Sequence, residues 1–458
     1  MKLLLKTLRW HPEGTDKLLW KGTKKQAALS SGLPSRRVDL VPVPHRIQLS
    51  RPISVASCNT PENLSPASLS QRPSLTINIL NESGVHFLNQ SMDTPVLQWG
   101  IIGAAQIARK FAAAVLSSPG SKLVSVASRS NGKAASFIDK VLSESKSDQM
   151  ASEISVHLCY EDMLADPSVD AVYIPLPNDM HAEWIEKALS CGKHVLVEKP
   201  AVLYVSEARN LLDAYISSRR HLSEGMPFLF NPLFDQVLSE ASSMGALKRV
   251  TCAFCHPLSA RGPECIAMQK NRGGGSLYAL GCYVIAAALR LCPAILESDC
   301  EPVVINSKFY APQVDLTLAV RFSTPSGCIL DLECSIDENT PKTQKLEIEC
   351  EFGSISVPNL FISSDSSIPS CYTVRKLGFP DEIKEAPPCD SFLAEVQDFE
   401  LVVANLSGDN AAGRSIQSTA SCSSNRDVEF TAGAHPFIKT IEQIIVMEKI
   451  ARCAGIMI

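Results

Sequence analysis

The segment Val96-Leu-Gln-Trp-Gly-Ile-Ile-Gly-Ala-Ala-Gln-Ile-Ala108 decides the fold of this chain. Its first half is a short apolar run that ends in glycine, which predicts a buried strand entering a tight turn. Its second half has the apolar spacing of a helix. Compared with the dinucleotide-binding pattern G-x-G-x-x-G/A, the turn keeps Gly103 and Ala108 but has Ala105 at the middle glycine. Small residues let N–H groups at the helix start approach a pyrophosphate, so the turn predicts nucleotide binding; a generic strand-to-helix turn is the alternative.

Strand and helix patterns alternate after this turn. Apolar runs at residues 123–128, 170–175 and 194–197 predict strands, and helical spacing at 106–115 and 181–190 predicts helices. The strands are apolar on both faces, which is typical of a parallel sheet covered by helices on each side. We therefore expect an α/β fold with a doubly wound parallel sheet.

The pattern changes beyond about residue 222. Hairpin turns are predicted at residues 324–327 and 351–354. Further strands, with few helices between them, are predicted at residues 250–254, 314–322, 328–334 and 346–350. This texture predicts an α+β domain built on a mostly antiparallel sheet. Residues 405–427 are polar and serine-rich, which predicts a loop.

The expected organisation has four parts. Residues 1–94 are expected to be a disordered or targeting extension, 95–222 the nucleotide-binding domain, 223–435 the substrate domain, and 436–458 a helix packing back on the body. Residues 1–90 carry 12 Lys and Arg against 5 Asp and Glu, whereas the whole chain has 43 against 48. The body is therefore acidic, which argues against a nucleic-acid groove.

The composition restricts which cell compartment and which bound metals we expect for this protein. No uninterrupted apolar run approaches the eighteen or so residues of a membrane helix, and the first residues are too polar for a secretory signal. We expect a cytoplasmic protein, or an organellar one if residues 1–94 are a transit segment. The 16 cysteines are then free thiols. The pair Cys252-Ala-Phe-Cys255 fits a strand better than a metal site, so no metal is predicted.

The end of the second strand indicates which cofactor is bound. An NAD site usually has an acid there for the ribose hydroxyls. This chain has Ala127-Ser128-Arg129-Ser130 instead. A guanidinium and hydroxyls suit a 2′-phosphate, which favours NADP over NAD. The alternative is that Arg129 is a solvated charge at a strand end.

Two further strand exits carry polar side chains. The segment Asn178-Asp-Met-His181 follows one exit, where its polar residues could serve the rim of a cofactor cleft or cap the next helix. The segment Leu196-Val-Glu198-Lys199-Pro ends the next strand. Cofactors and substrates sit at strand exits of open parallel sheets, so Lys199 beside an acid is placed for proton transfer to a substrate. A surface lysine is the alternative.

Taken together, these segments resemble the Gfo/Idh/MocA oxidoreductases, and most of all the branch of trans-1,2-dihydrobenzene-1,2-diol dehydrogenase and NADP-dependent D-xylose dehydrogenase. The resemblance runs from about residue 99 to 360 and leaves residues 1–94 outside. The matching segments are Trp99-Gly-Ile-Ile-Gly-Ala-Ala-Gln-Ile-Ala-Arg-Lys, Val126-Ala-Ser-Arg-Ser, Tyr173-Ile-Pro-Leu-Pro, His181-Ala-Glu-Trp, Gly192-Lys-His-Val-Leu-Val-Glu-Lys-Pro and Gly225-Met-Pro-Phe-Leu-Phe-Asn-Pro.

The resemblance implies a Rossmann domain, a second domain whose open sheet forms a homodimer, and a set of site residues. Lys199 would protonate or polarise the substrate oxygen, and Glu198 would contact the nicotinamide ribose. The residues implied for cofactor binding are Gly103, Ala105, Gln106, Ile107, Ser128, Arg129, Pro175, Leu176, Asn178, His181, Glu198 and Lys199.

The family's second catalytic segment corresponds to Gly274-Gly-Ser-Leu-Tyr-Ala279-Leu-Gly-Cys-Tyr283. The family tyrosine is present as Tyr283, four residues after the aspartate position and so on the same helical face. The aspartate itself is replaced by Ala279. The neighbouring aromatic–Arg pair of many relatives is also replaced, by Phe228-Leu229. A missing carboxylate removes a hydrogen bond or proton partner from the site.

The implied activity is hydride transfer between NADP and a cyclic polyol, sugar or dihydrodiol, with Lys199 and Tyr283 as catalytic residues. A cationic neighbour such as Lys199 is expected to lower the pKa of Tyr283 toward neutrality. Two alternatives stay open. One is a dinucleotide-binding sensor or scaffold that has lost the chemistry, which Ala279 supports. The other is a glycoside-cleaving enzyme that uses the nicotinamide transiently.

Overall fold

The computed structural model describes residues 96–145, 148–311, 314–362, 366–411 and 436–456. The extension expected at residues 1–94 lies outside this part of the chain, and so does most of the loop expected at 405–427. Residues 405–411 of that loop are instead the end of a helix. Ser391 begins this helix, whose apolar residues pack on a sheet and so extend helical order into a polar sequence.

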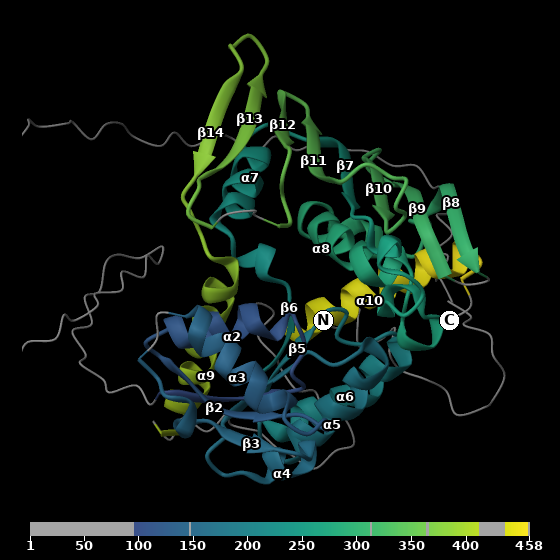
Figure 1. Cartoon of the computed structure of the whole chain (residues 1–458). Helices are drawn as coiled ribbons and strands as arrows, with labels where there is room; N and C mark the ends of the chain where they lie inside the picture. Colours follow the sequence, from purple (N-terminus) through teal and green to yellow (C-terminus); the bar gives the residue numbers. More distant parts are fainter. Residues whose placement is uncertain (1–95, 146–147, 312–313, 363–365, 412–435, 457–458) are drawn as a thin grey trace, which may run out of the picture. The chain divides into compact units, whose positions relative to one another are not determined.

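The first sheet has six parallel strands in the order β3-β2-β1-β4-β5-β6 (Figure 1). The chain runs outward from β1 in one direction and returns through β4 in the other, so the sheet is doubly wound, as predicted. Its strands are β1 (Leu97–Ile102), β2 (Ser121–Ala127), β3 (Ser155–His157), β4 (Ala171–Ile174), β5 (His194–Glu198) and β6 (Leu222–Gly225).

Helices cover both faces of this sheet. One face packs on α2 (Ala108–Ser117), α3 (Lys133–Glu144) and α9 (Ser391–Ala411). The other packs on α4 (Tyr160–Ala165), α5 (His181–Ser190) and α6 (Val205–Ser218). Side chains alternate between these two cores along each strand because the strand period is two. Trp99 and Ile101 of β1 enter the first core, and Ile102 enters the second.

Helix α9 corrects the assignment of all of residues 223–435 to the second domain. It follows the second sheet in the sequence, yet it packs on α2 and the first sheet. Phe399 lies 4.7 Å from Trp99 between ring centroids, and Phe111 of α2 lies 5.0 Å from the same indole edge-on. The apolar surface around Trp99 therefore draws in a distant helix, a contact that no local pattern reports.

The second sheet has eight strands in the order β14-β13-β12-β11-β7-β10-β9-β8, and the β7–β10 pair is parallel while the other pairs are antiparallel. The mostly antiparallel sheet is as predicted. Its strands are β7 (Leu247–Cys255), β8 (Val303–Ala311), β9 (Val314–Ser323), β10 (Ile329–Ser335), β11 (Thr343–Cys350), β12 (Gly353–Val357), β13 (Ser370–Lys376) and β14 (Glu382–Ala386).

Helices pack on one face of this sheet and leave the other open. Val250, Cys252 and Phe254 of β7 are buried under α7 (Pro232–Ser242), α8 (Cys282–Leu291) and α10 (Pro436–Cys453). On the open face, Asp331 of β10 accepts hydrogen bonds from Arg249 and Arg321 on the flanking strands. The sheet is therefore apolar toward the helices and charged on its open face.

One helical stretch in the described chain, Lys270–Leu291, is long and apolar enough to cross a membrane by length and composition. Its apolar window is 78% buried inside the protein. Burial of this degree is that of a core helix. The stretch contains a π-helical segment, Leu277–Gly281, that leads into α8. The short 3₁₀ segments of the chain are Ala151–Glu153, Asn178–Met180, Pro227–Phe230, Leu258–Arg261, Ile266–Met268, Lys270–Arg272 and Pro293–Leu296.

Candidate active site

The turn between β1 and α2 is shaped for an anion. Gly103 has φ of +106°, and a Cβ there would come within 2.8 Å of the Leu176 side chain. Its N–H bonds the carbonyl of Ala127, which fixes the turn against β2. Helix α2 has no side-chain cap and no acid in its first turn. The N–H groups of Arg109 and Lys110 bond the carbonyls of Gln106 and Ile107, so a phosphate would be met by the N–H groups just before them, and the backbone at Gly103 can approach it closely.

The exit of β2 presents the residues predicted for the cofactor's ribose. The N–H of Ser128 bonds the carbonyl of His157 on β3, and the hydroxyl of Ser128 accepts the N–H of Ser130. Arg129 is exposed, and its guanidinium carbon lies 5.4 Å from the ring centroid of Tyr160. The arginine thus stands over an aromatic ring at the strand end rather than extending freely into solvent. No acid occupies this segment.

The exit of β4 joins the two sheets. Pro175 and Leu176 are buried, so their side chains line the turn from beneath. The Asn178 amide donates to the carbonyl of Gly273 at 3.1 Å, and Asp179 accepts from Nε of Arg272 at 3.1 Å. Asn178, predicted as a cofactor ligand, therefore uses its amide to hold the segment that precedes the π-helix.

His181 contacts the backbone on two sides. The ring is fully buried, with Nδ1 2.8 Å from the carbonyl oxygen of Pro200 and Nε2 2.8 Å from that of Leu176. Burial lowers the pKa of His181, while the two carbonyls oppose that shift. Both ring nitrogens lie within hydrogen-bond distance of protein carbonyls, so the contacts that the structure shows for His181 are with the backbone. It ties the exit of β4 to the exit of β5.

At the exit of β5, alternation sends two neighbouring side chains to opposite sides. Glu198 turns toward the α2 side of the sheet, where its Oε1 accepts the hydroxyl of Tyr173 at 2.5 Å. Lys199 turns toward the second sheet, where its Nζ donates to the carbonyl of Ala279 at 2.7 Å. Burial raises the pKa of Glu198, and the charge of Lys199 opposes that shift. The peptide bond from Lys199 to Pro200 is cis.

Lys199 and Tyr283 come together as predicted from the sequence. Nζ of Lys199 lies 5.1 Å from the centroid of the Tyr283 ring. The ring is held by three phenylalanines at centroid distances of 5.4–5.9 Å, namely Phe228, Phe254 and Phe361. The ammonium meets the π face of the tyrosine, an attractive cation–π geometry.

The expected lowering of the Tyr283 pKa is wrong. Burial raises the pKa of the Tyr283 hydroxyl well above its ordinary value, and Glu198 is the next largest cause. Because Lys199 contacts the ring face, it does not offset the effect of burial on the hydroxyl. Tyr283 therefore stays protonated at neutral pH and acts as a hydrogen-bond donor or acceptor rather than as a base.

Three ionisable residues near Glu198 or Lys199 were not predicted. Tyr173 lies on β4, Glu224 on β6 and Glu395 on α9, and all three are buried or nearly so. Burial raises the pKa of Glu224 to about 7 and raises that of Glu395 well above its ordinary value. Tyr173 and Glu224 had a signal, because both stand near ends of strands in a parallel sheet. Glu395 had no such signal, because only the tertiary structure brings helix α9 against the first sheet.

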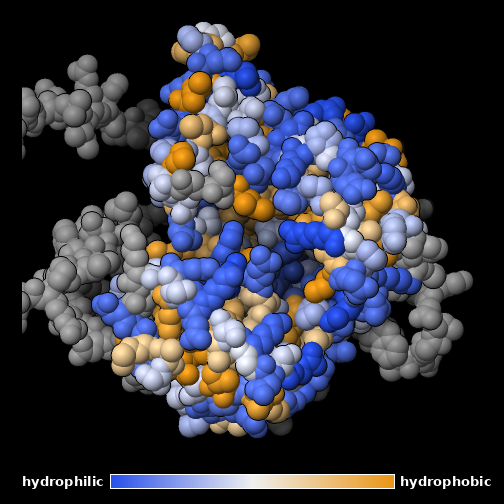
Figure 2. Space-filling model, viewed as in Figure 1, coloured by the Kyte–Doolittle hydropathy of each residue, from blue (hydrophilic) through white to orange (hydrophobic). Residues whose placement is uncertain are grey.

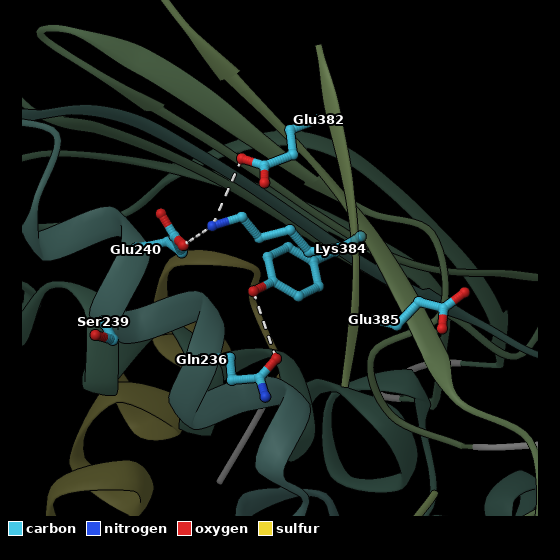
Figure 3. Close-up of a pocket in the computed structure, with 7 residues that line it drawn as sticks. Gln236, Ser239, Glu240, Glu382, Lys384 and Glu385 are labelled. Atoms are coloured by element: carbon cyan, nitrogen blue, oxygen red, sulfur yellow. Dashed lines mark hydrogen bonds and ion pairs between the residues drawn. The ribbon is translucent and has the colours of Figure 1, made fainter. Parts of the chain in front are cut away.

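One hollow of the surface lies away from Lys199 and is less suited to proton transfer. It has a volume of about 400 Å³ beside α7, β13 and β14 (Figure 3). Lys384 reaches between Glu240, with which it pairs closely, and Glu382 at 3.7 Å, while the Tyr372 hydroxyl meets Gln236 at 3.4 Å. These charges satisfy one another, and Lys199 is not among the lining residues. Figure 2 shows another hollow, in the face viewed in Figure 1, between the elements of the two sheets.

Comparison with protein families gives two matches. The model of the Gfo/Idh/MocA oxidoreductase family with an NAD-binding Rossmann fold matches residues 97–226. The model of the Gfo/Idh/MocA C-terminal domain matches residues 237–356. The two models together cover more than half of the chain, and each corresponds to one of the two sheets.

Individual relatives agree with these matches. An uncharacterized oxidoreductase of Rhizobium meliloti is 34% identical over 219 residues, 45% of this chain and 61% of the relative. D-xylose 1-dehydrogenase (NADP(+)) 2 of Haloferax volcanii is 28% identical over 309 residues, 67% of this chain and 89% of that enzyme. Trans-1,2-dihydrobenzene-1,2-diol dehydrogenase of Mus musculus is 28% identical over 252 residues, 54% of this chain and 71% of that enzyme.

Among solved structures, a 3-ketoreductase from Actinomadura kijaniata, in complex with NADP and TDP-benzene, has a TM-score of 0.62. The alignment covers 78% of this chain and 97% of the reductase, at 22% sequence identity. At this identity the likeness is one of fold. It agrees with the pairing of a parallel sheet with a mostly antiparallel one.

Proposed function

Because the chain belongs to the Gfo/Idh/MocA family of oxidoreductases, we propose that it is an NADP-dependent enzyme acting on a CH–OH group of a cyclic polyol, sugar or dihydrodiol. The observation that carries the proposal is the position of Lys199. It stands at a strand exit of the Rossmann sheet, and its ammonium is held by the Ala279 carbonyl and the Tyr283 ring from the second sheet's helix. Proton-transfer groups of this fold occupy such a place.

Lys199 has a free donor for a substrate. An ammonium carries three N–H groups, and the contacts with the Ala279 carbonyl and the Tyr283 ring use two. The nicotinamide, when bound, supplies or accepts the hydride. In the reducing direction Lys199 gives its proton to the substrate oxygen, and in the oxidising direction the neutral amine takes it back. Tyr283, protonated at neutral pH, hydrogen-bonds a substrate oxygen.

Support for NADP over NAD comes from the exit of β2. Arg129 stands there over Tyr160, Ser128 and Ser130 flank it, and no carboxylate is present to repel a 2′-phosphate. The turn at Gly103 and the uncapped start of α2 suit the pyrophosphate. A relative named as an NADP-dependent D-xylose dehydrogenase adds support for the same choice.

The loss of the family aspartate does not leave Lys199 without an anchor. At the position of that aspartate, the backbone carbonyl of Ala279 accepts the ammonium at 2.7 Å. The carbonyl is presented by the π-helical segment Leu277–Gly281. This observation favours a working enzyme over a sensor or scaffold, because the acid/base residue keeps a defined position.

The test is turnover. Purified protein would be offered a panel of sugars, glycosides, cyclic polyols and dihydrodiols with NADP and with NAD, and both nicotinamide absorbance and the products would be followed. We expect turnover with at least one of these substrates and a preference for NADP. Tight NADPH binding without turnover on the whole panel would favour the sensor or scaffold. Substrate cleavage without net cofactor reduction would favour the glycoside-cleaving alternative.

A further inference from the structure

Tyr173 and Glu198 are brought together by the register of the first sheet. Tyr173 of β4 pairs with Leu196 of β5, and Glu198 follows two residues later on the same face of the sheet. Tyr173 is 1% exposed, and its ring stacks on Phe111 at a centroid distance of 3.9 Å. Phe111 belongs to α2, the helix that begins at the anion-binding turn. A rigid aromatic contact therefore connects the cofactor helix to the acid beside Lys199.

The two residues make a direct hydrogen bond. The Tyr173 hydroxyl donates to Oε1 of Glu198 at 2.5 Å, and the N–H of Lys199 lies 3.3 Å from Oε2. A hydrogen bond to a charged group is stronger than one between neutral groups, and a ring locked by packing loses little entropy in making it. The carboxylate is thus held on one side by the tyrosine and on the other by the backbone of the proton-transfer residue.

We propose that Tyr173 is a positioning residue, which fixes the Glu198 carboxylate for its contact with the nicotinamide half of the cofactor and so aligns Lys199 with the substrate. This inference rests on the proposed function for its effect on turnover. It predicts no contact between Tyr173 and the substrate. Its effect on cofactor binding can be measured without any substrate.

Other ionisable groups lie near Glu198, and their charges interact with its carboxylate. Lys199, just after β5, favours the charged carboxylate, while Glu395 on α9, whose pKa Glu198 raises, accepts the N–H of Met226 at 2.7 Å. Tyr283 on α8 is also close enough to be affected by Glu198. Of these groups, Tyr173 is the one whose side chain donates a hydrogen bond to the carboxylate. Removing its hydroxyl should therefore let the Glu198 carboxylate move, because none of the other groups named here donates a side-chain hydrogen bond in its place.

The test is a double-mutant cycle of Tyr173→Phe and Glu198→Ala, with two ligands. NADPH reaches both halves of the site, whereas 2′,5′-ADP has the 2′-phosphate but lacks the nicotinamide half. We expect Tyr173→Phe to weaken NADPH binding by roughly three- to tenfold and to leave 2′,5′-ADP binding within a factor of two. Turnover of the best substrate should fall by about tenfold or more. In the Glu198→Ala background, Tyr173→Phe should cause little further loss.

Tyr372→Phe is the matched control, since it removes a tyrosine hydroxyl on β13 that meets Gln236 of α7, away from the first sheet. It should change neither ligand nor turnover. Equal weakening of NADPH and 2′,5′-ADP by Tyr173→Phe would show a general disturbance of the sheet and overturn the proposal. Additive effects in the cycle would overturn it too. If the wild type turns over nothing, the proposed function fails, and the binding cycle alone still decides whether Tyr173 positions Glu198.

Discussion

The exits of β2 and β5 lie on the same edge of one parallel sheet, yet they are built in opposite ways. At the exit of β2, Arg129 and Ser130 are exposed, and a charged side chain stands over a single aromatic ring. At the exit of β5, Lys199 lies near Glu198 and Glu224, and Glu395 lies near Glu198; burial raises the pKa of all three carboxyls. A solvated cation recognises a phosphate at little cost, whereas proton transfer needs charges that are strong because water is excluded. Within one sheet, the exposed exit of β2 is therefore suited to recognising the cofactor, and the buried exit of β5 is suited to proton transfer.

The largest expected effect comes from removing the chemistry at the exit of β5. Lys199→Met should cut turnover by roughly two or more decades, the usual scale for a lost general acid or base, because among the described residues Lys199 is the cation that donates to the Ala279 carbonyl. NADPH binding should stay within a few fold, since the phosphate contacts lie at β1 and β2. The control is Lys345→Met, an exposed lysine on β11. Turnover that survives Lys199→Met would refute the mechanism.

A change at the anion-binding turn should remove recognition instead. Gly103→Ala places a Cβ at φ of +106° and 2.8 Å from Cδ2 of Leu176, so the turn is strained and either the turn or the Leu176 side chain must shift. We expect NADPH binding to weaken by about a hundredfold, measured by fluorescence titration. Gly327→Ala is the control, because it carries similar strain at φ of +83° with no atom within 4 Å of the new Cβ. A similar loss of binding in both variants would mean that strain alone, and not the shape of the turn, is responsible.

Reversing the charge at the exit of β2 should change the choice of cofactor. Arg129→Glu replaces the guanidinium with a carboxylate that repels a 2′-phosphate and can accept ribose hydroxyls. NADP binding should weaken by about ten- to thirtyfold relative to NAD, as measured by calorimetry. Turnover at saturating cofactor should change little, because Arg129 is remote from Lys199. Equal preference for the two cofactors before and after the change would contradict the assignment.

Burial at the β5 exit also predicts a pH dependence of stability. Glu224 has a pKa raised from 4.5 to about 7, because burial outweighs its bonds from Ala201, Thr440 and Gln443. Between these values the folded state binds a proton that the unfolded state has released. This contribution to stability is therefore present below about pH 4.5 and is lost as the pH rises toward 7.

Glu224→Gln should remove that loss. The variant should equal the wild type near pH 5 and exceed it by about 1–3 kcal/mol at pH 8 in urea unfolding. The control is Glu349→Gln, since Glu349 is exposed on β11. Parallel stability curves for wild type and Glu224→Gln would show that the carboxyl is already charged in the folded protein.

The smallest expected effect is at Ala279. Ala279→Asp restores the family carboxylate beside a lysine that the backbone carbonyl already holds. We expect turnover to rise by no more than about fivefold, with NADPH binding unchanged. Turnover that appears only in Ala279→Asp would favour the sensor or scaffold for the natural chain. A loss of turnover would mean that the new carboxylate draws Lys199 away from the substrate.

Local patterns predicted much of the first sheet and part of the second. Strands β1, β4 and β5 are apolar on both faces, so their buried positions in a parallel sheet follow from their sequence alone. The two predicted hairpin turns are present between β9 and β10 and between β11 and β12. Strands β13 and β14 were not predicted, since both contain charged residues and neither carries a long apolar run.

The sequence by itself determined the anion-binding turn, the basic exit of β2 and the presence of Lys199 at a strand exit, because each depends on neighbours within a few residues. Tertiary structure alone decided what those residues meet. Only the folded sheets place the Ala279 carbonyl on Lys199, the Tyr173 hydroxyl on Glu198, and Glu395 of α9 behind them. These partners lie 25 to 197 residues away in the chain, and burial and contact, which set their charge states, are properties of the packed whole.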